Sequence, residues 1–132
     1  MKFKKYRLVS FRTEESEDIV FTEYNEMLKV DLPMAEELVA CRLDFTENKK
    51  HFLILNVSNA KGVTHDAKIY MQDPDTGMKN ILGAAFLASN PVSALLANIF
   101  IQTPKSFPAK FFAKKQDALD WIKELKNKNS YL

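Results

Sequence analysis

The segment HFLILNV at residues 51–57 is the clearest indication of the fold in this sequence. It is a nearly continuous apolar run, which is typical of a strand covered on both faces in a parallel sheet. A polar segment at Ser58–Gly62 follows it, and apolar residues then recur at helical spacing. Thr64 can cap the start of that helix, and Asp66 in its first turn is favoured by the helix dipole. The sequence therefore predicts a buried central strand, a loop and a helix.

Further along the chain, strand and helix patterns continue to alternate. Asp73-Pro74 breaks the first of these helices, because proline cannot continue one. The apolar run ILGAAFLA at residues 81–88 predicts a second buried strand, and its small residues allow a helix to pack closely against it. Asn90-Pro91 then joins a capping side chain to a proline at the first helical position, which predicts a helix over Asn90–Ile101.

The C-terminal part repeats the pattern on a smaller scale. Pro104 and Pro108 bracket an extended loop, and a short strand is predicted at Lys110–Ala113. The last helix is expected from about Lys115, and residues 126–132 are expected to fray as a tail.

The N-terminal part begins with two strand patterns. Residues 2–12 predict a strand, the polar stretch Thr13–Asp18 a turn, and Ile19–Tyr24 a second strand, which Met27–Val30 extends or pairs with. Asp31, followed by a proline and two glutamates, predicts the start of another helix. The predicted order is β-β-α-β-α-β-α-β-α, an α/β domain with a mixed, mostly parallel sheet and helices packed on it.

Length and composition agree with one globular domain over residues 1–132. The 132 residues are 46% hydrophobic and 27% charged, which argues against disorder. No apolar run approaches the roughly 18 residues of a membrane span, and the lysine-rich start lacks the apolar stretch of a signal peptide. We therefore expect a cytoplasmic protein without membrane insertion.

Charge is distributed in three blocks behind a net charge of +2. Residues 1–12 are basic, residues 13–48 hold eleven acidic side chains against two basic ones, and residues 49–132 hold twelve lysines against six acidic side chains. Such blocks can attract nucleic acid or a charged partner. No recognised nucleic-acid motif is present, so we expect the blocks to neutralise one another within the fold and predict no nucleic-acid partner.

The residues that carry chemistry are few. His51, His65 and Cys41 are the only histidines and the only cysteine, and they form neither a metal-ligand spacing nor a nucleophile–base motif. Three scattered glycines provide no phosphate-binding loop, and the Asp66 carboxylate would repel an anion at the helix that follows Gly62. The sequence therefore predicts no catalytic residues, no metal and no cofactor. An enzyme is not expected.

Most of the chain resembles a known group of small bacterial domains. The residues that carry the resemblance are FLILNV, GVTHDAKIYM, ILGAAFLASNPVSALLANIF, TPKSFPAKFF and DALDWIKEL, in this order. They are similar to the SpoIIAA-like, STAS-type domains, and in particular to the stand-alone branch of that group, whose biochemical role is largely unassigned.

The resemblance implies a non-catalytic regulatory module that binds another protein. In well-studied members, a serine at the start of the helix after the central strand is phosphorylated to release the partner. Here the Asp-Ser-Ser-Gly pattern of the group is absent, and Asp66 falls near the acceptor position, with Thr64 as the only hydroxyl at the helix start. Asp66 would then replace the phosphate charge permanently, or Thr64 would be the acceptor. On the alternative interpretation, both residues only cap the helix.

Two binding hypotheses follow. The first is a surface for an unidentified regulatory protein, formed by Asn59, Lys61, Gly62, Thr64, His65 and Asp66. The second is a pocket for a small apolar or amphipathic ligand, lined by the helix at Asn90–Ile101 and the segment Phe107–Phe112, with Phe100 and Phe107 as apolar residues and Asn98 as the polar one. A homodimer is a further hypothesis, because the N-terminal strand can pair with a second copy across a sheet edge.

Overall fold

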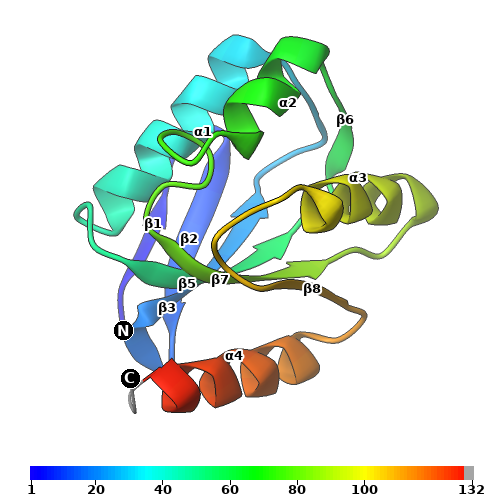
Figure 1. Ribbon diagram of the computed structural model, residues 1–132. Coiled ribbons are helices and arrows are strands. Elements are labelled where there is room, and N and C mark those ends of the chain that lie inside the picture. Colours follow the sequence, from blue (N-terminus) through cyan, green and yellow to red (C-terminus); the bar gives the residue numbers. More distant parts are fainter. Residues whose placement is uncertain (130–132) are drawn as a thin grey trace.

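The computed structural model describes residues 1–129 and has the predicted architecture, a mixed sheet with helices on both faces (Figure 1). The strands are β1 (Phe3–Lys5), β2 (Val9–Glu14), β3 (Ser16–Tyr24), β4 (Leu28–Val30), β5 (His51–Asn56), β6 (Ala60–Val63), β7 (Ile81–Leu87) and β8 (Ala109–Phe112). The helices are α1 (Leu32–Phe45), α2 (His65–Gln72), α3 (Pro91–Gln102) and α4 (Lys115–Asn129).

The main sheet has six strands in the order β1-β2-β3-β5-β7-β8. The pairs β1–β2 and β2–β3 are antiparallel, whereas β3–β5, β5–β7 and β7–β8 are parallel. A separate parallel pair, β4–β6, lies beside this sheet. The prediction of a mostly parallel sheet with an antiparallel start is confirmed.

Strand β5 lies in the middle of the sheet because its side chains are apolar on both faces. Phe52 and Ile54 point to the face that α4 covers, whereas Leu53 and Leu55 point to the face that α1, α2 and α3 cover. The two faces belong to two separate clusters of buried side chains. An alternating pattern would have left one face polar, so the continuous run required helices on both sides.

The three helices on the face opposite α4 begin where the sequence predicts. The carboxylate of Asp31 accepts a hydrogen bond from the backbone N–H of Met34 at 2.9 Å. Thr64 caps α2, and Asn90 caps α3 by accepting from the backbone N–H of Ser93 at 2.9 Å. Each capping side chain satisfies an N–H group that has no partner within its helix.

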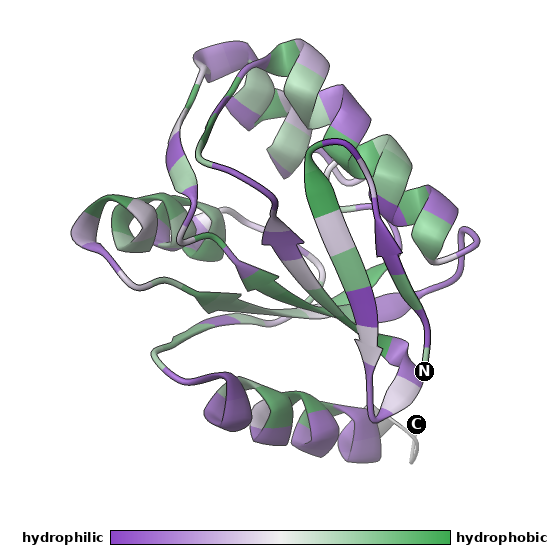
Figure 2. Ribbon diagram, turned by 180° about the vertical axis from the view of Figure 1, so that it is seen from behind, coloured by the Kyte–Doolittle hydropathy of each residue, from purple (hydrophilic) through white to green (hydrophobic). Residues whose placement is uncertain are grey.

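Helix α4 covers the other face by itself, with hydrophobic residues toward the sheet and hydrophilic ones toward solvent (Figure 2). Its side chains Ala118, Leu119 and Ile122 are buried. The helix continues to Asn129, and Lys126 contacts Asp18 at 2.7 Å, so the prediction that the chain frays from residue 126 is wrong for residues 126–129. Residues 130–132 of that predicted tail lie outside the described residues.

The N-terminal region and the segment after β5 differ from the sequence-based expectation. The expected strand at residues 2–12 is two strands, and the turn expected at residues 13–18 is a tight one at Glu15, whose φ is 65°. The segment Ser58–Gly62, expected to be a loop, contains most of β6, which pairs with β4. β6 is only four residues long and includes a glycine, so its sequence shows no alternation of apolar and polar residues. The strand is recognised only from its pairing with β4.

Candidate functional site

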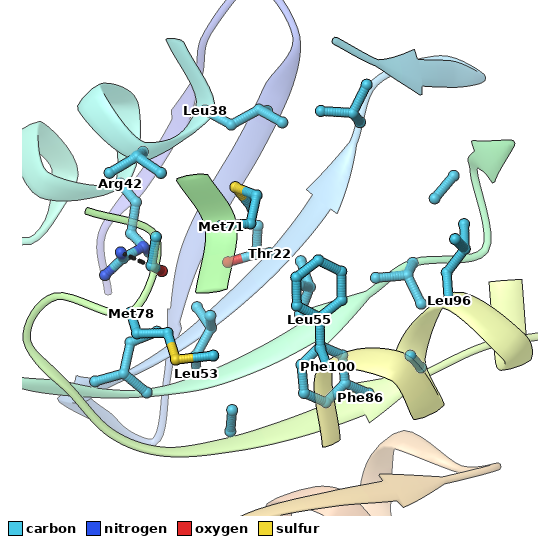
Figure 3. Close-up of a pocket in the computed structure, with 18 of the residues that line it drawn as sticks. Thr22, Leu38, Arg42, Leu53, Leu55, Met71, Met78, Phe86, Leu96 and Phe100 are labelled. Atoms are coloured by element: carbon cyan, nitrogen blue, oxygen red, sulfur yellow. Dashed lines mark hydrogen bonds between the residues drawn. The ribbon is translucent and has the colours of Figure 1, made fainter. Parts of the chain in front are cut away.

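A cavity of about 100 Å³ lies between the sheet and the helices α1, α2 and α3 (Figure 3). Protein interiors are usually packed as densely as organic crystals, and few voids exceed the size of a water molecule. An engineered apolar cavity of about 150 Å³ binds benzene, so this cavity has room for about four to six non-hydrogen atoms. Its dimensions suit a small ligand.

The cavity is lined mainly by apolar side chains from both layers. The sheet contributes Leu53, Leu55, Ala84 and Phe86, and the helices contribute Leu38, Met71, Leu96, Ala97 and Phe100. Four of the lining residues carry little or no side chain: Ala60, Gly62, Ala84 and Ala97. The layers therefore approach closely without filling the space between them.

Thr22 brings an unsatisfied polar group to the apolar wall. It lies on β3, is only 4% exposed, and faces the cavity (Figure 3). Its Oγ1 atom has no hydrogen-bond partner among the described residues. A buried hydroxyl without a partner destabilises the folded state by about 1–3 kcal/mol, so such groups are rare in native interiors. The position invites a ligand with a hydrogen-bonding group.

Arg42 is a second buried polar residue of the lining, at 5% exposure. From α1 it donates hydrogen bonds to the backbone carbonyls of Lys79 at 2.8 Å and Gly77 at 3.1 Å. It also contacts the Nε2 atom of His51 at 3.0 Å. Burial lowers the pKa of Arg42 to about 10, so the guanidinium keeps its charge at neutral pH.

The contact with Arg42 fixes the protonation state of His51. A guanidinium has only donors, so Nε2 of His51 must be the acceptor, and Nδ1 must carry the proton and donate to the carbonyl of Lys49 at 2.9 Å. Burial, together with the charge of Arg42, lowers the pKa of His51 to about 4. At neutral pH His51 is therefore a neutral histidine that anchors Arg42 beside the cavity.

The cavity adjoins a hollow on the protein surface. The two share Met78, Ile81, Lys105 and Phe107, which come from the loop before β7, the first position of β7 and the loop before β8. Lys105 is partly buried, and its Nζ atom donates to the backbone carbonyls of Ile101 and Thr103. Burial lowers its pKa. These shared residues mark the route by which a ligand would enter.

The structure brings together some of the residues predicted for a ligand pocket. Phe100 and Phe107 line the cavity, and so does Gly62, which had been assigned to a different site. Asn98 is exposed and does not line it, so the prediction of Asn98 as the polar residue is wrong. Asn98 follows the buried Ala97, and one residue along a helix turns the side chain by about 100°.

The residues predicted for partner binding lie at and before the start of α2. Lys61, His65 and Asp66 are exposed, whereas Asn59 is half-buried and donates to the backbone carbonyl of Tyr24 at 3.0 Å. The Thr64 hydroxyl donates to the Asp66 carboxylate at 2.6 Å.

Asp66 also holds the start of the helix. Its carboxylate accepts from the backbone N–H of Ala67 at 2.9 Å. The bond from Thr64 is the main reason why the pKa of Asp66 is lowered. Asp66 therefore stays ionised at neutral pH and forms a compact polar turn with Thr64.

Sequence reasoning missed the polar residues of the cavity, Thr22, Arg42 and Lys105. Two of them left a signal. Thr22 is a hydroxyl that directly follows the apolar run Ile19–Phe21 in β3, and Arg42 follows Leu38 by four residues, on the side of α1 that packs inward. Among residues 1–129, no three His, Cys, Asp or Glu side chains are grouped so that they could hold a metal ion.

The fold and the cavity define an α/β domain of the SpoIIAA-like fold with an internal apolar site. A similar crystal structure is that of an uncharacterized protein from the DUF3478 family of Shewanella loihica PV-4, which has a SpoIIAA-like fold. The two share 15% sequence identity with a TM-score of 0.59, over 89% of this chain and 96% of that one. At this identity the likeness shows the fold alone.

The sequence places the chain in a family. The model of a domain of unknown function, DUF7793, matches residues 13–126, and the chain belongs to this family. A search of curated proteins finds no match. No helix within residues 1–129 has the length and apolar character needed to cross a membrane.

Proposed function

We propose that this protein is a non-catalytic binding protein that holds a small apolar or amphipathic ligand in the cavity between the sheet and α1, α2 and α3. The observation that carries the proposal is the buried Thr22 hydroxyl, which faces an apolar cavity without a partner. If the cavity bound no ligand, a valine in place of Thr22 would make the folded protein more stable. A hydroxyl in the wall is useful once a ligand accepts or donates a hydrogen bond.

Water is a poor occupant of this space. A buried water molecule usually makes about three hydrogen bonds, whereas most of the lining is apolar. An alkyl chain gains about 0.8 kcal/mol for each methylene group that leaves water, and it needs no polar partners. An apolar body with one polar group therefore fits the wall better than water does.

Binding of straight-chain alcohols tests this proposal. With butan-1-ol to octan-1-ol, we expect the melting temperature to rise, because a ligand that binds only the folded state stabilises it. Affinity should increase about fourfold for each added methylene group and level off once the cavity is full. Calorimetric titration measures the affinities.

Two phenylalanine substitutions on α3 provide the matched comparison. Ala97→Phe places a ring in the cavity and should abolish alcohol binding, whereas Asn98→Phe places the same ring on the exposed side and should leave binding unchanged. The levelling-off with chain length tests the cavity even if Ala97→Phe does not fold. Equal binding of the alcohols to both variants would overturn the proposal. A lack of binding to the native protein would overturn it as well.

A second candidate function is binding of a regulatory protein at the start of α2. It is favoured by Ile69, an apolar side chain that is 56% exposed, on the same helix as the exposed His65 and Asp66. A phosphate on Thr64 would lie against the Asp66 carboxylate, which its hydroxyl already contacts. We therefore favour Asp66 as a permanent negative charge over Thr64 as a phosphate acceptor.

Charge reversal tests this surface. Asp66→Arg should abolish crosslinking to a stoichiometric protein partner in the native cells, because it reverses the charge at the centre of the surface. Asp117→Arg is the matched control, since Asp117 lies in the first turn of α4, on the opposite face of the sheet. Mass spectrometry of the crosslinked complexes provides the measurement. An unchanged set of partners with Asp66→Arg would show that this surface is not used.

A further inference from the structure

We infer that the ligand of the cavity is an amphipathic carboxylate whose head group binds Arg42. The inference rests on the proposed function and names the chemical class of the ligand. Three features of the structure carry it: a buried cation without a counter-charge, N–H groups of that cation that the protein leaves unused, and a lining without acidic side chains.

The charge of Arg42 is not neutralised within the protein. Its three bonds go to two backbone carbonyls and to a neutral histidine, so every partner is uncharged. Buried charges in proteins are normally paired, because removing an ion from water has a large energetic cost. Among the described residues, none of the ion pairs involves Arg42. A bound anion would supply the missing charge.

Arg42 also keeps donors for such an anion. A guanidinium has five N–H groups, and the bonds to His51, Lys79 and Gly77 use three of them. These bonds hold the side chain in place at the wall of the cavity (Figure 3). A carboxylate matches the planar arrangement of guanidinium donors and accepts two parallel hydrogen bonds from it. Little conformational freedom remains to be lost when it binds.

The charges around the cavity favour an anion throughout. Its lining contains Arg42 and Lys105 but no aspartate or glutamate, and the adjoining hollow adds Lys50, again without an acidic side chain. Opposite charges in a recessed site attract each other strongly, because the surrounding protein screens them less than water does. An amine would be repelled along the whole route, whereas a carboxylate is attracted at the opening and again inside.

The body of the ligand follows from the remaining lining. Apart from Thr22, Tyr24, Arg42 and Lys105, the lining consists of leucine, isoleucine, valine, methionine, phenylalanine, alanine and glycine residues. A single guanidinium balances the one charge of a carboxylate. A doubly charged phosphate would need further donors that an apolar wall does not supply. The chemistry therefore fits a short alkanoate, with its chain among these side chains.

Three ligands of equal length provide the test. We would measure the binding of butanoate, butan-1-ol and butylamine to the native protein by calorimetric titration at neutral pH, because ligands of this length stay within the size of the cavity. Butanoate should bind about tenfold more tightly than butan-1-ol, because hydrogen bonds to a charged group are stronger than neutral ones. Butylamine should bind most weakly.

Substitutions identify the cation responsible. Arg42→Met should remove the preference for butanoate over butan-1-ol, while Lys105→Met, at the opening, should retain most of it. Arg42→Lys keeps the charge without the planar pair of donors, and we expect an intermediate preference. This variant and the comparison of ligands on the native protein decide the matter if Arg42→Met does not fold.

The outcomes separate the two proposals. If butanoate and butan-1-ol bind equally well, the inference is wrong and the proposed apolar site stands. If none of the three binds, both are wrong. If Lys105→Met removes the preference and Arg42→Met does not, the head group lies at the opening, and the assignment to Arg42 is overturned.

Discussion

Replacing Gly77 with alanine is expected to lower the free energy of unfolding by about 3 kcal/mol, at the upper end of the range for overpacked interiors. A Cβ atom at this position would lie 2.2 Å from the backbone oxygen of Met71 and 2.3 Å from its Cα atom. Both belong to the main chain of α2, which cannot move aside as a flexible side chain can. The loop that contains Gly77 must therefore shift away from the helix.

That shift would also disturb the candidate site. The carbonyl of Gly77 accepts a hydrogen bond from Arg42, and Gly77 itself lines the cavity. We therefore expect Gly77→Ala to weaken ligand binding along with stability. Urea denaturation monitored by circular dichroism measures the loss of stability, and calorimetric titration with butanoate measures the weaker binding.

Gly62→Ala is the matched control for Gly77→Ala. Gly62 also lines the cavity, but the nearest atom to an added Cβ there is Cγ of Lys29, at an ordinary contact distance of 3.9 Å. Its effect should stay within about 1 kcal/mol, in either direction. Equal losses of stability for the two variants would show that the close approach of Gly77 to α2 is not the cause.

Acid should destabilise the protein through His51, by about 3 kcal/mol between pH 7 and pH 4. The folded protein lowers the pKa of His51 from 6.5 to about 4, and each pH unit corresponds to about 1.36 kcal/mol. Between these two values the unfolded chain binds more protons than the folded one, so the free energy of unfolding decreases as the pH falls. The contribution is fully present above the unfolded pKa and is lost as the pH falls to the folded one.

The variant His51→Gln isolates this contribution. A glutamine side chain does not titrate, and its amide oxygen can accept the hydrogen bond from Arg42 that Nε2 of His51 accepts. Other groups titrate alike in both proteins, so their difference in stability across pH reports on His51. Urea denaturation from pH 7 to pH 4 should show a steeper decline for the native protein. Parallel curves would contradict the assignment of a buried neutral histidine.

One group of residues affects both stability and ligand binding. It consists of Arg42, His51 and the loop at Gly77–Lys79. His51 opens the central strand, Arg42 lies near the end of α1, and the two carbonyl groups belong to the loop between α2 and β7. Each holds the guanidinium beside the cavity. Residues that stabilise the fold here also orient the group that we propose binds the ligand.

Local sequence patterns were sufficient to predict the parts of the fold that depend on neighbouring residues. Asp31, Thr64 and Asn90 cap helices because each has a side-chain oxygen within reach of backbone N–H groups in the following turn. The run at residues 51–57 determined the central strand, because apolar side chains on both faces require cover on both sides. Phe100 and Phe107, which the sequence offered only as a hypothesis for a ligand pocket, lie in the lining of the cavity.

The position of the candidate site and the identity of its polar groups depend on contacts between distant parts of the chain. Thr22, Arg42 and Lys105 come from a strand, a helix and a loop that are far apart in the sequence, and no local pattern links them. The cavity exists because small side chains on β6, β7 and α3 face one another, which depends on the register of strands and helices in space. Asn98 is an example. It was a candidate because it is a polar residue of the helix expected to line a pocket, but it lies one position after the buried Ala97 and is exposed to solvent.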